Sequence, residues 1–182
     1  MREDQERWLE ALKARQEDAV RQLVREFGEP LRRYCAAMVR SPADGEDLAQ
    51  EALARFVGAV DTFRGEASVK TYLFRIAHNL ALNHLASSPV THEELPGEIR
   101  EGPSPTVSPL HAAQSREESR MLREAVARLP PQQRAVVALR TWQDLSFKEI
   151  GAVMGLAEGT AKAHYFFALR NLRRQLEPSD EP

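Results

Sequence analysis

Apolar positions recur at intervals of three and four residues along most of the chain, a period that predicts helices rather than strands. The clearest run covers residues 129–176, where short turns separate three helical segments. Pro130 and Pro131 are suited to begin the first of them, because proline fits a first turn, where a backbone N–H has no partner. Ser146, followed three residues later by Glu149, is a capping box that predicts the start of the second. The run therefore predicts three consecutive helices.

The last two of these helices have the features of a helix-turn-helix motif. Gly155 suits the left-handed conformation that ends a helix, and Gly151 is a small residue where the helices would cross. A turn of 100° per residue gives the third helix an apolar core face and a basic outward face, which suits the major groove of DNA. The predicted core face consists of Ala161, Tyr165, Ala168, Leu172 and Leu176, and the outward face and its flanks of Gly159, Thr160, Lys162, Ala163, Phe166, Phe167, Arg170, Arg173 and Arg174.

The charge of this segment favours DNA binding over an ordinary solvated surface. Lys and Arg outnumber Asp and Glu by eight to three over residues 128–176, whereas the whole chain has a formal net charge of −2. A basic face is common in helical bundles, but a positive segment within a mildly acidic chain has the charge that phosphate contacts require. We therefore predict that the C-terminal part binds DNA.

The N-terminal part also has a helical pattern. It predicts helices over 8–27 and 31–39, separated by the Gly and Pro at 28–30. Ser41 and Pro42 predict the start of a third helix that continues to about residue 60. Ser68 is expected to cap a fourth helix, over 69–85, which is apolar on two sides and should therefore be packed on two sides.

Two polar surfaces stand out on these helices. Asp47 and Glu51 lie one turn apart on the third helix, with Gln50 on the flank. Like charges at this spacing destabilise a helix by roughly 0.2–0.5 kcal/mol, so the pair is either an ordinary solvated face or an acidic edge for a basic partner.

The polar stripe of the fourth helix combines aromatic, guanidinium and amide groups. Such groups suit stacking and edge contacts with single-stranded bases. Polar helix faces are common, however, so the stripe taken alone favours an ordinary solvated face. The stripe consists of Tyr72, Arg75, Asn79 and Asn83.

The segment 87–114 departs from the helical pattern. It holds five of the eleven prolines, and its charged groups are Arg100 and four glutamates. This composition predicts an acidic, proline-rich linker.

Composition argues against several other classes of protein. A single cysteine excludes internal disulfides and cysteine-cluster metal sites, and the five histidines lack the spacing of metal ligands. No apolar run approaches the roughly 20 residues of a membrane span, and no signal peptide is evident. We expect a cytoplasmic protein without membrane insertion, metal, cofactor or enzymatic activity, since no catalytic motif is present.

Two blocks of sequence resemble the extracytoplasmic-function RNA polymerase sigma factors. Residues 44–53 (DGEDLAQEAL), 63–65 (FRG) and 72–79 (YLFRIAHN) resemble region 2 of that family. Residues 129–134 (LPPQQR), 145–150 (LSFKEI) and 155–162 (GLAEGTAK) resemble its region 4. The resemblance implies an all-α protein with two small helical domains: region 2 over 1–86 and a helix-turn-helix region 4 over 115–177, joined by the linker 87–114.

The resemblance also implies a function. The chain would bind bacterial core RNA polymerase, recognise the −35 and −10 promoter elements and promote promoter melting. The linker would thread into the polymerase channels, where its acidic residues would face a basic wall. An anti-sigma factor is the expected regulatory partner, clamped between the two domains.

Specific residues are implied for each contact. The β′ clamp of the polymerase would bind Asp47, Gln50 and Glu51, and the β flap is a further expected contact. The −10 element would contact Lys70, Tyr72, Arg75, Asn79 and Asn83. The −35 element would contact Thr160, Lys162, Ala163, His164, Phe167 and Arg170.

Three departures from the family pattern affect these assignments. Tyr72 stands where tryptophan is usual, Asn83 where aspartate is frequent, and Ala-His-Tyr-Phe-Phe over 163–167 replaces a more polar sequence. We expect Phe166 or Phe167 to contact a thymine methyl group and the other to pack on polymerase or an inhibitor. The alternative is that both extend the core of the domain.

Two other classes of protein share some of these features. A polymerase-independent helix-turn-helix regulator would have an α/β ligand or receiver domain in its N-terminal half, but residues 1–86 show no strand pattern. A sigma mimic that titrates an anti-sigma factor would lack a competent −10 surface, whereas Tyr72, Arg75 and Asn79 are present.

Overall fold

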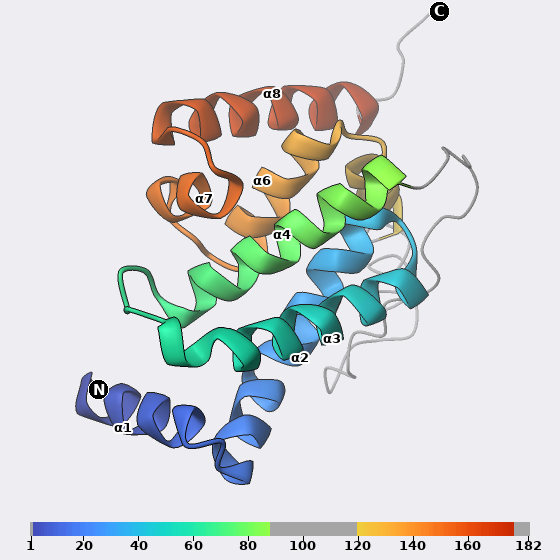
Figure 1. Ribbon diagram of the computed structural model, residues 1–182. Coiled ribbons are helices and arrows are strands. Elements are labelled where there is room, and N and C mark those ends of the chain that lie inside the picture. Colours follow the sequence, from blue (N-terminus) through green and yellow to red (C-terminus); the bar gives the residue numbers. More distant parts are fainter. Residues whose placement is uncertain (1, 88–119, 177–182) are drawn as a thin grey trace, which may run out of the picture.

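The structure is a computed structural model that describes residues 2–87 and 120–176, with side chains from residue 6 onward. Within these residues the regular secondary structure is entirely helical, as predicted (Figure 1). The linker predicted over 87–114 lies outside the described residues except for Ser87. The helices are α1 (Arg2–Lys13), α2 (Glu17–Val39), α3 (Pro42–Ala59), the 3-10 helix η1 (Val60–Thr62), α4 (Val69–Ser87), a helical stretch over 120–127, α6 (Pro131–Thr141), α7 (Phe147–Met154) and α8 (Glu158–Leu176).

The break in the N-terminal helices lies earlier than the sequence pattern predicted. α1 ends at Lys13 and α2 begins at Glu17, whereas the predicted interruption at 28–30 is helical. A proline inside a helix costs roughly 3 kcal/mol, but α2 buries a long apolar stripe, and this burial outweighs the cost. The stripe consists of Ala19, Leu23, Phe27, Leu31, Tyr34, Cys35 and Met38.

The predicted capping residues do begin α3 and α4. The Ser41 Oγ accepts a hydrogen bond from the Asp44 N–H at 3.3 Å, with Pro42 in the first turn. The Ser68 Oγ accepts one from the Thr71 N–H at 3.0 Å. Each cap satisfies a backbone N–H that has no partner within its helix.

α2 and α3 cross at very short range. A Cβ placed on Gly45 of α3 would lie 2.5 Å from the Cα of Ala36 in α2, which is closer than two packed carbon atoms approach. The crossing therefore requires glycine at this position.

The helix-turn-helix has the predicted caps. The Ser146 N–H donates to a carboxylate oxygen of Glu149 at 2.8 Å, and the Glu149 N–H donates to the Ser146 Oγ at 3.3 Å. The Ser146 hydroxyl also donates to this carboxylate at 2.6 Å, and this hydrogen bond, followed by the one from the Ser146 N–H, holds the pKa of Glu149 below its usual range. Gly155 ends α7 with φ +68°, and a Cβ on Gly151 would lie 2.6 Å from the Leu156 carbonyl oxygen. Both glycines thus serve the predicted purposes.

The predicted core face of α8 is confirmed along most of the helix. Ala161, Ala168 and Leu172 are buried and Tyr165 is half-buried. Leu176 is 40% exposed, so its placement in the core was wrong. It is the last residue of α8, one turn beyond Leu172, which is the last buried residue of this helix.

α4 is packed on two sides, as its two apolar sides predicted. α3 and α2 contact one side, and α7, from the C-terminal half, lies against the helix from the other direction (Figure 1). The side chains of Phe74, Ala77 and Ala81 are fully buried as a result. The two halves of the chain therefore share a closed arrangement, with α2 also contacting α6.

Candidate functional site

The acidic edge of α3 is open to solvent. Asp47, Gln50 and Glu51 are all exposed on one side of the helix. Glu51 forms an ion pair with Arg55 at 2.7 Å, in which both side chains are about half exposed. Exposed pairs at this spacing contribute about 0.3–0.5 kcal/mol, so an incoming cation can displace Arg55 at small cost.

An aromatic cluster supports the N-terminal part of α4. The ring of Tyr72 lies edge-on to Phe63, with 5.3 Å between ring centroids, and 5.9 Å from Phe56. Phe56 is fully buried, while Phe63 and Tyr72 are half-buried and keep part of their surface in solvent. The arrangement offers partly open aromatic surface at the start of the predicted −10 stripe.

Phe63 is a site residue that the sequence interpretation did not single out. It follows η1 and precedes the turn at Gly65, whose φ is +72°. The FRG segment was recognised as part of a family motif, but nothing in its spacing indicated that its aromatic ring would contact Tyr72. The contact is visible only once α3, η1 and α4 are placed together.

The turn between α1 and α2 braces the segment that leads to Phe63. Arg15, in the left-handed conformation with φ 54°, donates a hydrogen bond to the Val57 carbonyl oxygen at 2.9 Å. Its guanidinium also pairs with Asp61 in η1 at 3.3 Å. On the other side of the turn, the Trp8 Nε1–H donates to the Ala19 carbonyl oxygen at 3.2 Å. α1, whose Leu12 is fully buried in the core, and the turn that follows it thereby support η1.

The rest of the predicted −10 set divides into two groups. Arg75, Asn79 and Asn83 are exposed along one side of α4. Lys70 differs, because its Nζ donates a hydrogen bond to the Gln143 carbonyl oxygen at 2.5 Å, in the C-terminal half. In the closed arrangement, Lys70 is therefore engaged with protein.

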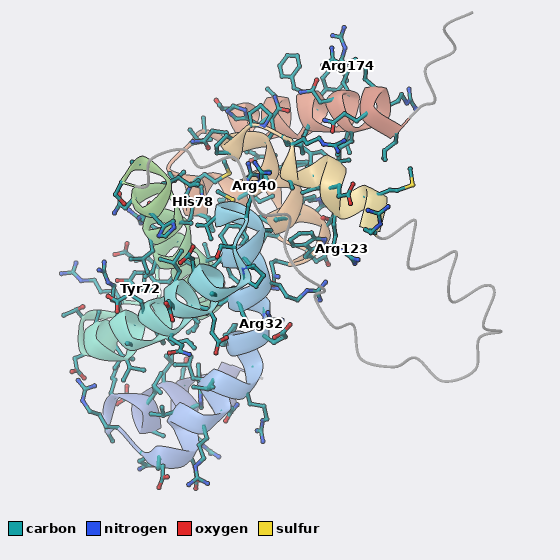
Figure 2. All side chains as sticks on the ribbon, turned by 90° about the vertical axis from the view of Figure 1, so that its right-hand side faces the viewer. Arg32, Arg40, Tyr72, His78, Arg123 and Arg174 are labelled. Atoms are coloured by element: carbon teal, nitrogen blue, oxygen red, sulfur yellow. The ribbon has the colours of Figure 1, made fainter. Side chains whose placement is uncertain are left out.

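Beside the stripe, a buried polar pair joins α4 to α2. The Tyr34 Oη and the His78 Nδ1 lie 2.8 Å apart, and His78 is only 1% exposed (Figure 2). Burial lowers the pKa of His78 to about 4, because the charged imidazolium loses its hydration. The pair ties α4 to α2 with a neutral histidine at physiological pH.

The outward face of α8 carries most of the predicted −35 residues. Thr160, Lys162, Ala163, Phe167 and Arg170 are exposed, and His164 is half-buried. The same face continues to Arg174, which points away from the body of the molecule (Figure 2).

Phe166 and Phe167 do not extend the core. They are 65% and 49% exposed, and their rings meet edge to face with 5.8 Å between centroids. Large exposed apolar groups of this kind mark surfaces that contact a partner. The interpretation in which both rings belong to the domain's own core is therefore wrong.

The described residues contain neither a candidate metal site nor a candidate membrane span. Over 2–87 and 120–176, no three His, Cys, Asp or Glu side chains are grouped so that they could hold a metal ion. Over the same residues, no helix is long and apolar enough to cross a bilayer.

Comparison with known proteins assigns the family. The sequence matches the family models for Sigma-70 region 2 over residues 23–88 and for Sigma-70 region 4 over residues 119–172. An RNA polymerase sigma-E factor of Streptomyces coelicolor is 32% identical over 158 residues, which cover 86% of this chain and 85% of that protein. The ECF RNA polymerase sigma-E factor of Escherichia coli is 31% identical over 143 residues, which cover 74% and 75%.

The fold is also shared with a solved structure. The sigma factor RpoE of Bartonella quintana, in complex with the anti-sigma factor NepR, matches with a TM-score of 0.67 at 21% identity, over 88% of this chain and 98% of that chain. At this identity the likeness is one of fold. The two family models together with the two relatives give the conclusion directly: the chain belongs to the extracytoplasmic-function family of RNA polymerase sigma factors.

Proposed function

We propose that this sigma factor divides its work between three surfaces of the described structure. The acidic edge of α3 binds the clamp of core polymerase, the exposed stripe of α4 contacts the −10 element, and the outward face of α8 reads the −35 element. The observation that carries the proposal is that one chain has both a surface suited to single-stranded DNA and a surface suited to double-stranded DNA. Partly open aromatic rings and amides lie on α4, and exposed basic and apolar groups lie on α8.

The proposed domains are region 2 over 1–86, a linker over 87–114 and region 4 over 115–177. The proposed residues for each contact are Asp47, Gln50 and Glu51 for polymerase, Lys70, Tyr72, Arg75, Asn79 and Asn83 for the −10 element, and Thr160, Lys162, Ala163, His164, Phe167 and Arg170 for the −35 element. The chain performs binding and positioning, and we assign it no catalytic step. Because polymerase and promoter DNA are cytoplasmic, the proposal places the protein in the cytoplasm.

We also propose regulation by an anti-sigma factor. The Bartonella relative was solved with such a partner, and Phe166 and Phe167 supply exposed apolar surface on this chain. A partner that covered them would block α8 from DNA.

Run-off transcription with bacterial core polymerase and fragments of genomic DNA tests the proposal. Transcripts that share two upstream motifs are the expected result. Glu51→Lys should lower affinity for core polymerase, since it replaces an attractive charge by a repulsive one, while leaving α8 unchanged. Glu26→Lys, at an exposed position of α2 outside the proposed contact sets, is the matched control. Binding to DNA without any effect of core polymerase would contradict the proposal.

A further inference from the structure

A buried arginine joins the two halves of the molecule. Arg134 belongs to α6 and is only 5% exposed. One guanidinium nitrogen donates to the Met38 carbonyl oxygen at 2.7 Å and to the Ala37 carbonyl oxygen at 3.2 Å, both in the last turn of α2. The other donates to the Leu129 carbonyl oxygen at 3.0 Å, within the C-terminal half. The side chain thus spans the boundary between the halves.

The charge of Arg134 is balanced by a helix end rather than by a carboxylate. Within the described residues its hydrogen-bond partners are all backbone carbonyl groups. The last carbonyls of a helix carry partial negative charge and favour a cation. Burial, and then the nearby charge of Arg40, lower the pKa of Arg134 to about 10, so it remains charged near neutral pH. Arg40 lies where the end of α2 meets the C-terminal half (Figure 2).

Two further contacts cross the same boundary. Lys70 of α4 donates to the Gln143 carbonyl oxygen at 2.5 Å, and the Arg33 guanidinium lies 5.9 Å from the centre of the Trp142 ring. All three contacts join cations to groups at or just beyond the ends of α2 and α6. The apolar side of α4 against α7 completes the boundary.

The closed arrangement is too small to reach two promoter elements at once. α7 lies between α4 and α8 (Figure 1), and adjacent helices pack about 8–10 Å apart, which separates the axes of α4 and α8 by roughly 20 Å. Elements centred near −10 and −35 are about 25 base pairs apart, or roughly 85 Å at about 34 Å per ten base pairs. Contact points at opposite ends of α4 and α8, each 19 residues and about 28 Å long, still fall well short.

We propose that the closed form is an inactive state of the free chain, latched by Arg134 on the C-terminal carbonyls of α2. Opening breaks these hydrogen bonds, frees Lys70 for the −10 element and lets α8 move away from α4. The latch itself is a property of the free protein, while its consequence for promoter recognition rests on the proposed function.

Energy transfer between two labels tests the latch directly. Gln22 of α2 and Gln175 of α8 are exposed and belong to none of the proposed contact sets, so Gln22→Cys and Gln175→Cys supply labelling sites. The native Cys35 is fully buried and its pKa is raised to about 12 by burial, so it stays unlabelled in the folded protein. The full-length free chain should populate mainly the closed arrangement, in which the labels are closer together than in an opened chain.

Two variants should move this distance in opposite directions. Arg134→Lys keeps the charge but loses the planar guanidinium, whose two terminal nitrogens donate in different directions. Because hydrogen bonds from a charged donor are lost, the ratio of open to closed molecules should rise at least about tenfold. Arg40→Asn removes the like charge beside Arg134 while tolerating the left-handed conformation of φ 62°. It should make the closed population larger.

A folding control keeps the test decisive. Helix content by circular dichroism should match the parent in both variants. If Arg134→Lys loses helix because its bond to Leu129 is weakened, Arg33→Ala serves instead, since its contact across the boundary is with the Trp142 ring and its loss should shift the ratio roughly 2–5-fold. A long label distance in the parent chain, or a distance unchanged in a folded Arg134→Lys or Arg33→Ala variant, would overturn the latch.

Affinity for core polymerase separates this proposal from the proposed function. If opening precedes binding, the apparent affinity rises in proportion to the open fraction, so Arg134→Lys should bind core polymerase at least about tenfold more tightly than the parent. A folded, open variant with unchanged affinity would overturn the inhibitory role. A parent chain that neither binds core polymerase nor supports transcription would overturn the proposed function, whatever the label distance.

Discussion

α4 and α8 are the two helices proposed to meet DNA, and they are held in contrasting ways. α4 is buried on two sides and leaves a narrow polar stripe, with Arg75, Asn79 and Asn83 exposed. α8 rests on a short row of buried residues and exposes most of its circumference, including the rings of Phe166 and Phe167. Both helices have 19 residues, so the difference lies in their surroundings rather than their length.

The contrast matches two kinds of recognition. Extruding a base from the duplex costs a few kcal/mol of stacking energy. A rigid surface captures the base more favourably, because no further free energy is lost in ordering the protein. A helix that enters an intact major groove must instead project from its domain. If the proposed contacts are right, rigidity belongs to the −10 surface and exposure to the −35 surface. Four predictions test this division, in order of decreasing effect.

The first prediction concerns acid stability, which should be limited by α4. In the unfolded chain His78 takes up a proton near pH 6.5, whereas in the fold its pKa is about 4. Between these values the unfolded state binds more protons, so the free energy of unfolding falls as pH is lowered from about 6.5 to 4, by on the order of 3 kcal/mol in total. Urea unfolding at several pH values measures it.

His78→Gln is the control for this effect. Glutamine can still hydrogen-bond with the Tyr34 hydroxyl but does not titrate, so the variant should lose much of the pH dependence over this interval, even if it is less stable at pH 7. An identical pH dependence in the parent and the variant would show that other groups set the acid stability.

The second prediction concerns Tyr72. Tyr72→Ala removes the ring next to Phe63 and should lower open-complex formation roughly 5–150-fold, as expected for about 1–3 kcal/mol of base stacking. Tyr72→Phe should retain most activity, since it keeps the ring. Permanganate footprinting of unpaired thymines near −10 measures the effect. Full melting by Tyr72→Ala would show that stacking on the Tyr72 ring is not needed to open the promoter.

The third prediction concerns Arg170 on α8. Arg170→Ala should weaken binding to duplex −35 DNA roughly 5–20-fold and lower the slope of log affinity against log salt by about one if its contact is a phosphate. Binding to a single-stranded −10 fragment should not change, because α4 is untouched. Arg21→Ala, an exposed arginine of α2, is the matched control. Equal losses with both variants would indicate a general effect of charge.

The fourth prediction concerns the two exposed phenylalanines. Phe167 shares the outward face with Arg170, so Phe167→Ala should relax the preference for thymine at one position near −35 about 3–4-fold, the amount expected for one buried methyl group. Phe166→Ala should leave base preference unchanged and instead weaken binding of a protein partner. Selection from a randomised −35 library measures the base preference of both variants. An unchanged base preference in Phe167→Ala would show that Phe167 does not contact the −35 DNA.

The local features of the fold were predictable from sequence because their causes are local. Ser146 with Glu149, Ser68, and the glycine at 155 act within a few residues of their own positions, and each has the predicted conformation or hydrogen bond. The two apolar sides of α4 likewise predicted burial on two sides.

The features that were missed depend on distant parts of the chain. Pro30 lies inside α2 because burial of a long stripe outweighs a local preference, and no local signal carries that balance. The Phe63–Tyr72 contact and the bond from Lys70 to Gln143 join separate segments. Arg134 belongs to the LPPQQR motif, but neighbouring residues do not reveal that two of its partners lie 96 and 97 positions away. The roles assigned to the site residues stay predictions until binding is measured.

The absence of a side chain at Gly45 sets the distance between two proposed contact surfaces, the acidic edge of α3 and the polar stripe of α4. α3 carries the acidic edge, and the close crossing at Gly45 sets how deeply that helix sits against α2, on which α4 also packs. A larger residue at 45 would lift α3 and displace the acidic edge relative to the polar stripe of α4. Substitutions here would therefore keep every proposed contact residue in the sequence, yet shift the proposed polymerase contact relative to the proposed −10 contact.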